Sequence, residues 1–277
     1  FVFLHAFKGT SKDAFLPWLK KEIEDRGGKV FAPNLPNTNE PNVEEQASFA
    51  LKNHTFSKNT IVVTHSLGGP VAMKLLPQIK TKIRGLIMAA PPLRTEFLDD
   101  KPRPVLEKAC DWKFNFEAIK ERVSRRIVVM RDLNDHIVPP NHPQEIAKNL
   151  GADLIEVKAQ NTHFNGIAEP EILDVLVPGI KVFTTRPDTL FGATYMVLAP
   201  EHSLIKNLEH RIENIVEVKK YVEQASRKTE RIRMQEGGND PLSHKSSEGQ
   251  GKTGVELKGI KAINPATKEE IPVFVAD

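Results

Sequence analysis

The sequence predicts an α/β protein whose first part is a doubly wound parallel sheet and whose second part is a smaller α+β unit. Two observations predict this arrangement. Short apolar runs alternate with amphipathic stretches from residue 1 to about residue 177, which is typical of parallel strands joined by crossover helices. The alternation stops at the Pro-Gly pair 178–179, so we expect domains at residues 1–177 and 178–277.

The first domain is expected to contain six strands and several helices. Leu16, Leu19 and Ile23 recur at helical spacing, as do Val71 and Leu75. The Pro-containing stretch at 91–104 is irregular and is expected to cover a cleft. The predicted strands are residues 1–5, 30–33, 60–64, 83–89, 127–130 and 154–157.

The second domain follows a different pattern. A strand is predicted at 180–185, an apolar run lies at 195–199, and a charged helical stretch covers about 201–233. Residues 236–253 are rich in Gly, Ser and charge, which predicts a loop. The chain begins with Phe inside one predicted strand and ends inside another at 271–277, so we expect an internal piece of a longer polypeptide.

Composition excludes several classes of protein. Lys and Arg total 39 against 36 Asp and Glu, and a net charge of +3 is too balanced to indicate nucleic-acid binding by itself. The single cysteine, Cys110, cannot form an internal disulfide, and no apolar run approaches the roughly 18 residues of a membrane helix. We therefore predict a cytoplasmic protein with no membrane contact and no metal site.

A candidate nucleophile lies at Ser66, within Thr-His-Ser-Leu-Gly at 64–68. An apolar run precedes it and an amphipathic stretch follows, and this succession of strand, sharp turn and helix exposes a serine hydroxyl above a sheet. A serine in this context needs backbone donors for the oxyanion that forms when it attacks. The expected oxyanion donors are the N–H groups of Leu67 and of Ala6 or Phe7.

A base and an acid follow in the order typical of α/β-hydrolases. Asp135 comes after the predicted strand 127–130, and His163 comes after the strand 154–157. Taken singly, each residue has an ordinary explanation: a serine before a helix is often an N-cap, an aspartate in a turn is often an Asx turn, and a lone histidine is usually structural. Asp132 competes with Asp135 as the acid, and His65 is expected to pack or to support the oxyanion loop rather than to act as the base.

The first domain resembles small serine hydrolases of the retinoblastoma-binding-protein-9 type. The resemblance implies an α/β-hydrolase with Ser66, Asp135 and His163 as its triad, acting on a small ester or peptide-like substrate. Thr64 and Ala6 depart from the family pattern, because glycine is usual at both positions. The matching segments are residues 5–7, 15–20, 32–38, the Ser66 turn, 134–135 with 138–139, and 163–165.

The stretch at 180–195 contains several threonines next to a proline turn. By composition alone it is an ordinary Thr-rich turn, but its sequence resembles the threonine-rich peptide of leucyl-tRNA synthetase, in the connective-peptide-1 editing domain. Residues 197–202, 253–255, 262–265 and 271–277 continue the resemblance. It implies part of an α+β/β-barrel editing domain, with Thr189 excluding correctly attached leucine. The implied editing pocket is Thr184, Thr185, Arg186 and Thr189.

Together the two resemblances predict a segment of a leucine–tRNA ligase with an accessory hydrolase domain. The partner would be tRNA(Leu), which the segment meets through the parent enzyme. No cofactor is expected in this segment, since ATP and Mg²⁺ belong to the synthetase core. The family's amino-group-anchoring aspartate is expected beyond Asp277. Two alternatives remain: a free-standing serine hydrolase with a remnant editing segment, and a catalytically silent hydrolase fold that serves as a docking module.

Overall fold

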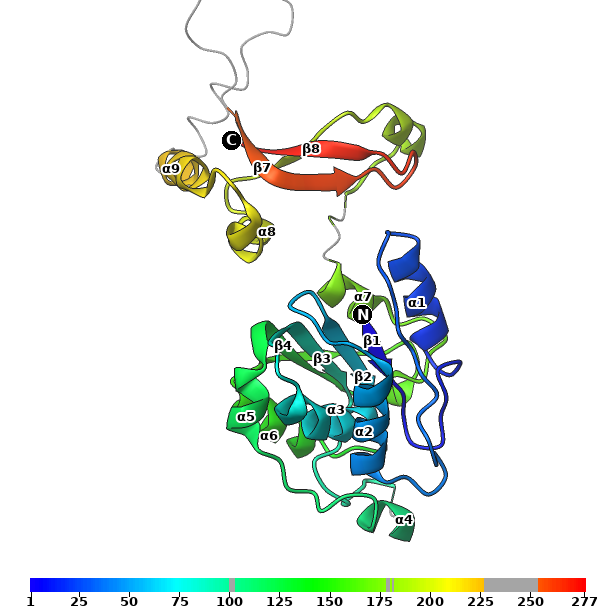
Figure 1. Ribbon diagram of the computed structural model, residues 1–277. Coiled ribbons are helices and arrows are strands. Elements are labelled where there is room, and N and C mark those ends of the chain that lie inside the picture. Colours follow the sequence, from blue (N-terminus) through cyan, green and yellow to red (C-terminus); the bar gives the residue numbers. More distant parts are fainter. Residues whose placement is uncertain (100–102, 178–179, 181, 227–253) are drawn as a thin grey trace, which may run out of the picture. The chain divides into compact units, whose positions relative to one another are not determined.

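The computed structural model describes residues 1–277 except 100–102, 178–179, 181 and 227–253 (Figure 1). The chain divides into two compact units, residues 1–179 and residues 180–277. None of the helices described is long and apolar enough to cross a lipid bilayer. The predicted loop at 236–253 lies outside the described residues.

The first unit is built on a five-stranded parallel sheet with the order β1-β2-β3-β4-β5. Successive side chains along each strand point to opposite faces of the sheet, and helices cover both faces. The strands are β1 (Val2–Leu4), β2 (Ile61–His65), β3 (Ile83–Ala89), β4 (Val123–Asp132) and β5 (Asp153–Val157).

Each face of this sheet has its own apolar core. The helices are α1 (Leu16–Glu24), α2 (Val43–Asn53), α3 (Gly68–Leu75), α4 (Pro104–Glu107), α5 (Phe116–Glu121), α6 (Asn141–Leu150) and α7 (Pro170–Leu176). Val2, Leu4 and Val62 pack in one core with helices α2, α3, α5 and α6, and Phe3 and Val63 pack in the other with α1 and α7 (Figure 1). Short 3₁₀ turns are η1 (Leu76–Gln78) and η2 (Thr162–Phe164).

The strand predicted at 30–33 is reduced to one isolated bridge. Phe31 pairs with Val2, and its backbone forms hydrogen bonds with Phe1 and Phe3, the residues on either side of Val2. Pro33 has no N–H to extend this ladder, and Gly27 and Gly28 precede it, so the pairing stops after one residue. Strand β4 is longer than predicted, because it begins at Val123.

The second unit contains a three-stranded sheet with the order β6-β8-β7, in which β6 is parallel and β7 antiparallel to β8. Val218, Leu257 and Val275 are fully buried in its core. The elements are β6 (Met196–Leu198), β7 (Gly254–Ile263), β8 (Glu270–Ala276), α8 (Ser203–Asn207), α9 (Ile215–Ser226), and the 3₁₀ turns η3 (Pro187–Gly192) and η4 (Glu209–Arg211).

Two predictions for the second unit were wrong. The described residues of 180–185 form no strand, because the exposed residues 182–185 have no neighbouring strand to pair with. The helix predicted over 201–233 is interrupted between α8 and α9. Asn214 lies at that interruption, where its side chain accepts from the Lys258 N–H and donates to the Glu256 carbonyl, which ties the break to β7. Residues 227–233 lie outside the described part.

Candidate active site

Ser66 lies in the sharp turn between β2 and α3. Its backbone adopts a left-handed conformation with φ of 50°, and its N–H donates to the Ala89 carbonyl on β3. Non-glycine residues adopt this conformation mainly where the surrounding structure imposes it, and they cluster at active sites. The following glycine is required by space, since a Cβ on Gly68 would lie 2.2 Å from the Leu4 carbonyl oxygen. The turn predicted from 64–68 is therefore formed.

Two backbone N–H groups are available as donors, one directly after Ser66 and one in the loop after β1. Within the described part of the chain, the N–H groups of Leu67 and Phe7 donate no hydrogen bond. Leu67 is the N-cap of α3, where the helix presents the positive end of its dipole. The loop that carries Ala6 and Phe7 is held by His5, whose ring contacts the Ala6 carbonyl through Nδ1 and the Leu35 N–H through Nε2, each at 2.9 Å.

Asp135 and His163 are brought together across 28 residues of sequence. Asp135 Oδ2 lies 2.8 Å from His163 Nδ1, and Oδ1 accepts the N–H groups of Ile137 and Val138. Burial by itself raises the pKa of Asp135, but the hydrogen bond to His163 and the two backbone N–H groups outweigh it, so the pKa is lower than usual. An ionised Asp135 fixes the proton of His163 on Nδ1 and leaves Nε2 as the basic nitrogen.

The loop carrying His163 lies next to the Ser66 turn. The rings of His163 and His65 are 5.4 Å apart, centre to centre, and His65 immediately precedes Ser66. Among the described residues, neither Ser66 Oγ nor His163 Nε2 forms a hydrogen bond. Catalytic hydrogen bonds are often long in the absence of substrate and tighten when substrate binds.

Asp132, the competing acid, has a different position. Its carboxylate is 1% exposed and accepts three backbone N–H groups, those of Asn134, Ala159 and His163. It therefore holds the backbone of the histidine loop and does not bond to the imidazole. Asp135 is the carboxylate that faces the ring.

Glu169 has a similar role that the sequence did not reveal. It is fully buried, and its carboxylate accepts N–H groups of Gln160, Asn161 and Gly166, on both sides of His163. Burial raises the pKa of Glu169, although the three N–H groups oppose this effect. A glutamate directly before a proline is an ordinary helix start, so no local signal marks it.

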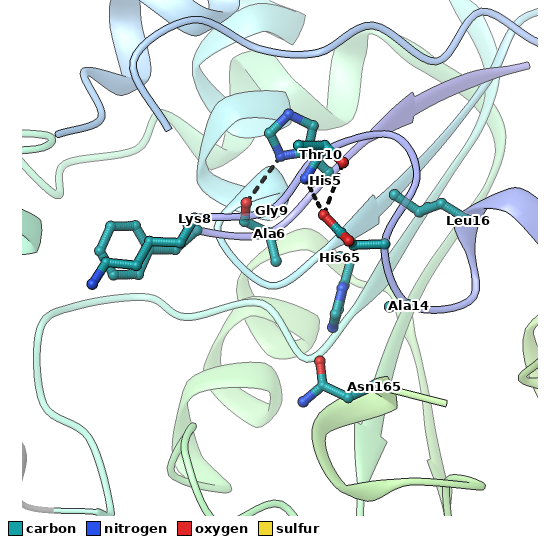
Figure 2. Close-up of a pocket in the computed structure, with 11 residues that line it drawn as sticks. His5, Ala6, Lys8, Gly9, Thr10, Ala14, Leu16, His65 and Asn165 are labelled. Carbon is teal, nitrogen blue, oxygen red and sulfur yellow. Dashed lines mark hydrogen bonds between the residues drawn. The ribbon is translucent and has the colours of Figure 1, made fainter. Parts of the chain in front are cut away.

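A cavity of about 260 Å³ lies between the loop after β1, the end of β2 and the histidine loop (Figure 2). The loop after β1 forms one side of it, with Ala6 and Phe7, and Ala14 and Leu16 add apolar surface. His65 and Asn165 border it from the nucleophile turn and the histidine loop. The cavity is therefore bounded by the elements that carry the candidate oxyanion donors, the nucleophile and the base.

The threonine-rich loop of the second unit is exposed and bonds mainly to itself. Thr184 Oγ1 accepts the Arg186 N–H at 3.0 Å, and Thr189 Oγ1 donates to the Arg186 carbonyl at 2.7 Å. The Arg186 side chain pairs with Asp188. The Thr185 hydroxyl forms no hydrogen bond in the described part of the chain. Three of the four predicted pocket residues are thus joined to one another.

Asn264 anchors this loop from the end of β7. Its side chain is 2% exposed, and its Nδ2 donates to the carbonyls of Leu190 and Ala193, at 2.6 and 3.4 Å. Its Oδ1 accepts the N–H groups of Ala266 and Thr267. The Asn-Pro pair at 264–265 signals a turn in the sequence, but the contact with the threonine-rich loop spans more than 70 residues and has no local signal.

Among the described residues, Glu44, Cys110 and Asp111 are close enough to share a metal ion. Lys74 contacts both carboxylates and supplies a positive charge at the same place. Burial raises the pKa of the Cys110 thiol to about 12, so the thiolate that binds metals is disfavoured. This cluster is an ion-pair network on the surface.

Comparison with known protein families also divides the chain into two parts, with a boundary a few residues before the one between the compact units. Residues 1–169 match the family described as "Serine hydrolase", and residues 172–277 match the family described as "Leucyl-tRNA synthetase, editing domain". The ydeN gene product of B. subtilis has a similar structure, with a TM-score of 0.55 and 26% identity, and the match covers 63% of this chain and 95% of that one. The esterase Est1E of Butyrivibrio proteoclasticus shares the fold, with a TM-score of 0.50, 14% identity and coverage of 63% and 85%.

Curated relatives are leucine–tRNA ligases. The enzyme of Alkaliphilus oremlandii is 41% identical over 129 residues, which cover 45% of this chain and 15% of the ligase. The enzyme of Flavobacterium psychrophilum is 31% identical over 182 residues, which cover 63% of this chain and 17% of the ligase. The chain thus spans under a fifth of the length of these relatives. Both alignments cover more of the chain than the second unit, which holds about a third of the residues, so both extend into the first unit.

Proposed function

The chain belongs to the serine hydrolase family, and we propose that its first unit cleaves an ester or peptide-like bond through an acyl-enzyme at Ser66. The observation that carries this proposal is the strained Ser66 turn, with φ of 50°, next to the unoccupied N–H of Leu67. A serine held in this way has its hydroxyl and an oxyanion donor on the same side of the substrate carbonyl.

The proposed reaction uses three side chains. Ser66 Oγ attacks the substrate carbonyl while His163 Nε2 accepts the hydroxyl proton, and Asp135 stabilises the imidazolium that forms. The tetrahedral oxyanion accepts hydrogen bonds from Leu67 and from Phe7 or Ala6. His163 then gives its proton to the leaving alcohol or amine. Water, deprotonated by the same nitrogen, releases the acid and restores Ser66.

A fluorophosphonate probe tests this proposal directly, because it reacts only with an activated serine. We expect the wild-type chain to be labelled and Ser66→Ala not to be labelled. Ser57→Ala is the matched control, since Ser57 lies in a turn before β2 and contacts Thr60 rather than the site. Absence of labelling in the wild type, or equal labelling of Ser66→Ala, contradicts the proposal. That outcome favours the alternative of a silent hydrolase fold used for docking.

We further propose that the second unit is part of an editing site that acts on mischarged tRNA(Leu) in the cytoplasm, within a leucine–tRNA ligase. The match of residues 172–277 to the editing-domain family supports this proposal, as do the ligase relatives. A synthetic site separates aliphatic side chains that differ by one methylene by only about 1–3 kcal/mol, so such enzymes need a second hydrolytic sieve. In this proposal the chain itself holds no cofactor, and ATP and Mg²⁺ bind the synthetase core.

In the editing site, Thr184, Thr185 and Arg186 would line the pocket and Thr189 would exclude leucine. The test is deacylation by the ligase that carries these residues. We expect Thr189→Ala to hydrolyse leucyl-tRNA(Leu), which the wild type spares, and Thr189→Ser to behave in an intermediate way. Unchanged discrimination in Thr189→Ala contradicts the assigned role.

The reading frame around this sequence separates a ligase segment from a free-standing hydrolase. We expect synthetase ATP-binding motifs in the same open frame. Stop codons immediately on both sides favour the alternative, in which the second unit is a remnant attached to a hydrolase.

A further inference from the structure

His163 depends on side chains for the hydrogen bonds of its own backbone. It adopts a left-handed conformation, with φ of 60° and ψ of 27°, and Phe164 follows with φ of 53°. A left-handed residue between two irregular segments has no regular partner for its N–H and C=O, and both of these groups are buried here. Unpaired buried backbone groups are rare because leaving them unpaired is unfavourable.

Two buried side chains supply those partners. Asp132 Oδ2 accepts the His163 N–H at 3.0 Å, and the ring Nε2 of His65 lies 2.8 Å from the His163 carbonyl oxygen. His65 is 2% exposed and also packs on Phe15, with ring centres 5.3 Å apart. Figure 2 shows its ring directed from the strand toward Asn165, two residues after His163.

We propose that His65 is a positioning residue for the base. Its Nε2–H donates to the His163 carbonyl, and because Ser66 directly follows His65 in the chain, this hydrogen bond fixes His163 relative to Ser66. This proposal rests on the function proposed above for the Ser66 site. It assigns to His65 a contact with the histidine loop, whereas the sequence suggested packing or support of the oxyanion loop. The contact joins the nucleophile turn to the histidine loop by one hydrogen bond.

Because His65 stays neutral, it can serve as a fixed donor. Burial, with a smaller contribution from the neighbouring His163, lowers the pKa of His65 to about 3. A neutral imidazole carries one proton, and the facing carbonyl places that proton on Nε2. The donor therefore does not change with pH over the range in which a histidine base works.

The proposal is tested with His65→Leu and His65→Gln. Leucine fills part of the space without a donor, whereas glutamine offers an amide N–H. His54→Leu is the matched control, because His54 also stacks on a phenylalanine, Phe31 at 4.9 Å, but contacts no residue of the site. Tryptophan fluorescence during thermal unfolding identifies any variant that fails to fold.

The first readout is the proton resonance of His163 Nδ1–H in its hydrogen bond to Asp135, which does not depend on turnover. We expect this resonance in the wild type, in His65→Gln and in His54→Leu, and its loss or broadening in His65→Leu. Retention of the resonance in His65→Leu overturns the proposal even if the chain hydrolyses nothing.

The second readout is the rate of Ser66 labelling by the fluorophosphonate and the hydrolysis of p-nitrophenyl acetate. A misplacement of about 1 Å in a catalytic group reduces rate by about 100-fold, so we expect His65→Leu to lose about 10- to 100-fold in kcat with KM unchanged, and His65→Gln to recover most of it. Equal rates in His65→Leu and wild type contradict the positioning role and leave the proposed function intact. An unlabelled wild type contradicts the proposed function, and the positioning role is then decided by the His163 resonance.

Discussion

The two candidate sites of this chain are built in opposite ways. In the first unit, Ser66, Asp135 and His163 come from three distant parts of the sequence, and groups on other segments hold the backbones of Ser66 and His163. In the second unit, Thr184, Arg186 and Thr189 lie in one short exposed loop and bond to one another. The first arrangement depends on the topology of the sheet, whereas the second depends on local sequence and on one anchor at its end.

The largest effect is expected from separating the acid from the base in the first site. Asp135→Asn keeps the size of the side chain but removes the charge that stabilises the His163 imidazolium, and it offers an amide where Nδ1–H needs an acceptor. We expect kcat for ester hydrolysis to fall by about 10³- to 10⁴-fold. Steady-state kinetics with p-nitrophenyl acetate measure this loss.

Asp153→Asn is the control for Asp135→Asn. Asp153 pairs with Arg126 at an exposed edge of the sheet, and exposed pairs contribute little. Its hydrolysis rate should match the wild type. A loss in Asp135→Asn no greater than in Asp153→Asn contradicts the assignment of Asp135 as the acid.

Acid should distinguish the two units, because only the described core of the first contains buried histidines. Burial lowers the pKa of His65 to about 3 and that of His142 to about 4, well below the 6.5 of an unfolded histidine. The unfolded state therefore takes up protons first. The free energy of unfolding of the first unit should fall by on the order of a few kcal/mol as pH drops from about 6.5 to about 4.

Both tryptophans, Trp18 and Trp112, lie in the first unit, so their fluorescence reports its unfolding in urea. Hydrogen exchange in β7 and β8 reports the second unit, whose stability should respond less to acid. His142→Leu should flatten the pH dependence of the first unit, because it removes one of the two histidines with the largest decrease in pKa. An unchanged slope in this variant contradicts the explanation.

The anchor of the threonine-rich loop offers the next test. Asn264→Ala removes an amide group that donates to two carbonyls and accepts two N–H groups. The Asn264 side chain is 2% exposed, so these four backbone groups lose a buried partner. We expect the second unit to lose about 2 kcal/mol of unfolding free energy, since a buried group left unpaired costs about 1–3 kcal/mol. Faster hydrogen exchange at Thr189 and Ala193 should accompany the loss.

Thr185→Ala is the control for the Asn264 variant. The Thr185 hydroxyl has no hydrogen-bond partner in the described part of the chain, so exchange at Thr189 should not change. If Asn264→Ala and Thr185→Ala give the same exchange rates, the loop does not depend on its anchor.

The comparison also shows what the sequence can and cannot predict. The turn after β2 and the order Ser, Asp, His could be predicted because each residue follows a local strand pattern. In parallel sheets, functional residues gather at the carboxyl ends of the strands, which relates the three positions to one another. The strand at 180–185 was predicted wrongly because its apolar residues have no partner strand. Glu169 and Asn264 were missed because a buried carboxylate or amide is recognised by the backbone groups it meets, and those contacts arise only in the folded chain.

The smallest expected effect concerns Thr64, which stands where the hydrolase pattern usually has glycine. Its side chain is fully buried, and its hydroxyl has no hydrogen-bond partner. Thr64→Val keeps the branched shape and removes the unpaired hydroxyl, so we expect a gain of about 1 kcal/mol, or about 2–4 °C in the Tm of the first unit. Tryptophan fluorescence measures the change.

Thr60→Val makes the same exchange directly before the same strand, where the hydroxyl accepts the Ser57 N–H at 3.0 Å. This variant should lose stability, because the Ser57 N–H is left without its acceptor. Opposite signs at the two positions would show that threonine is tolerated at 64 for its shape and not for its hydroxyl. Destabilisation by Thr64→Val would instead mean that the hydroxyl has a partner, and that this threonine helps to hold the turn of Ser66.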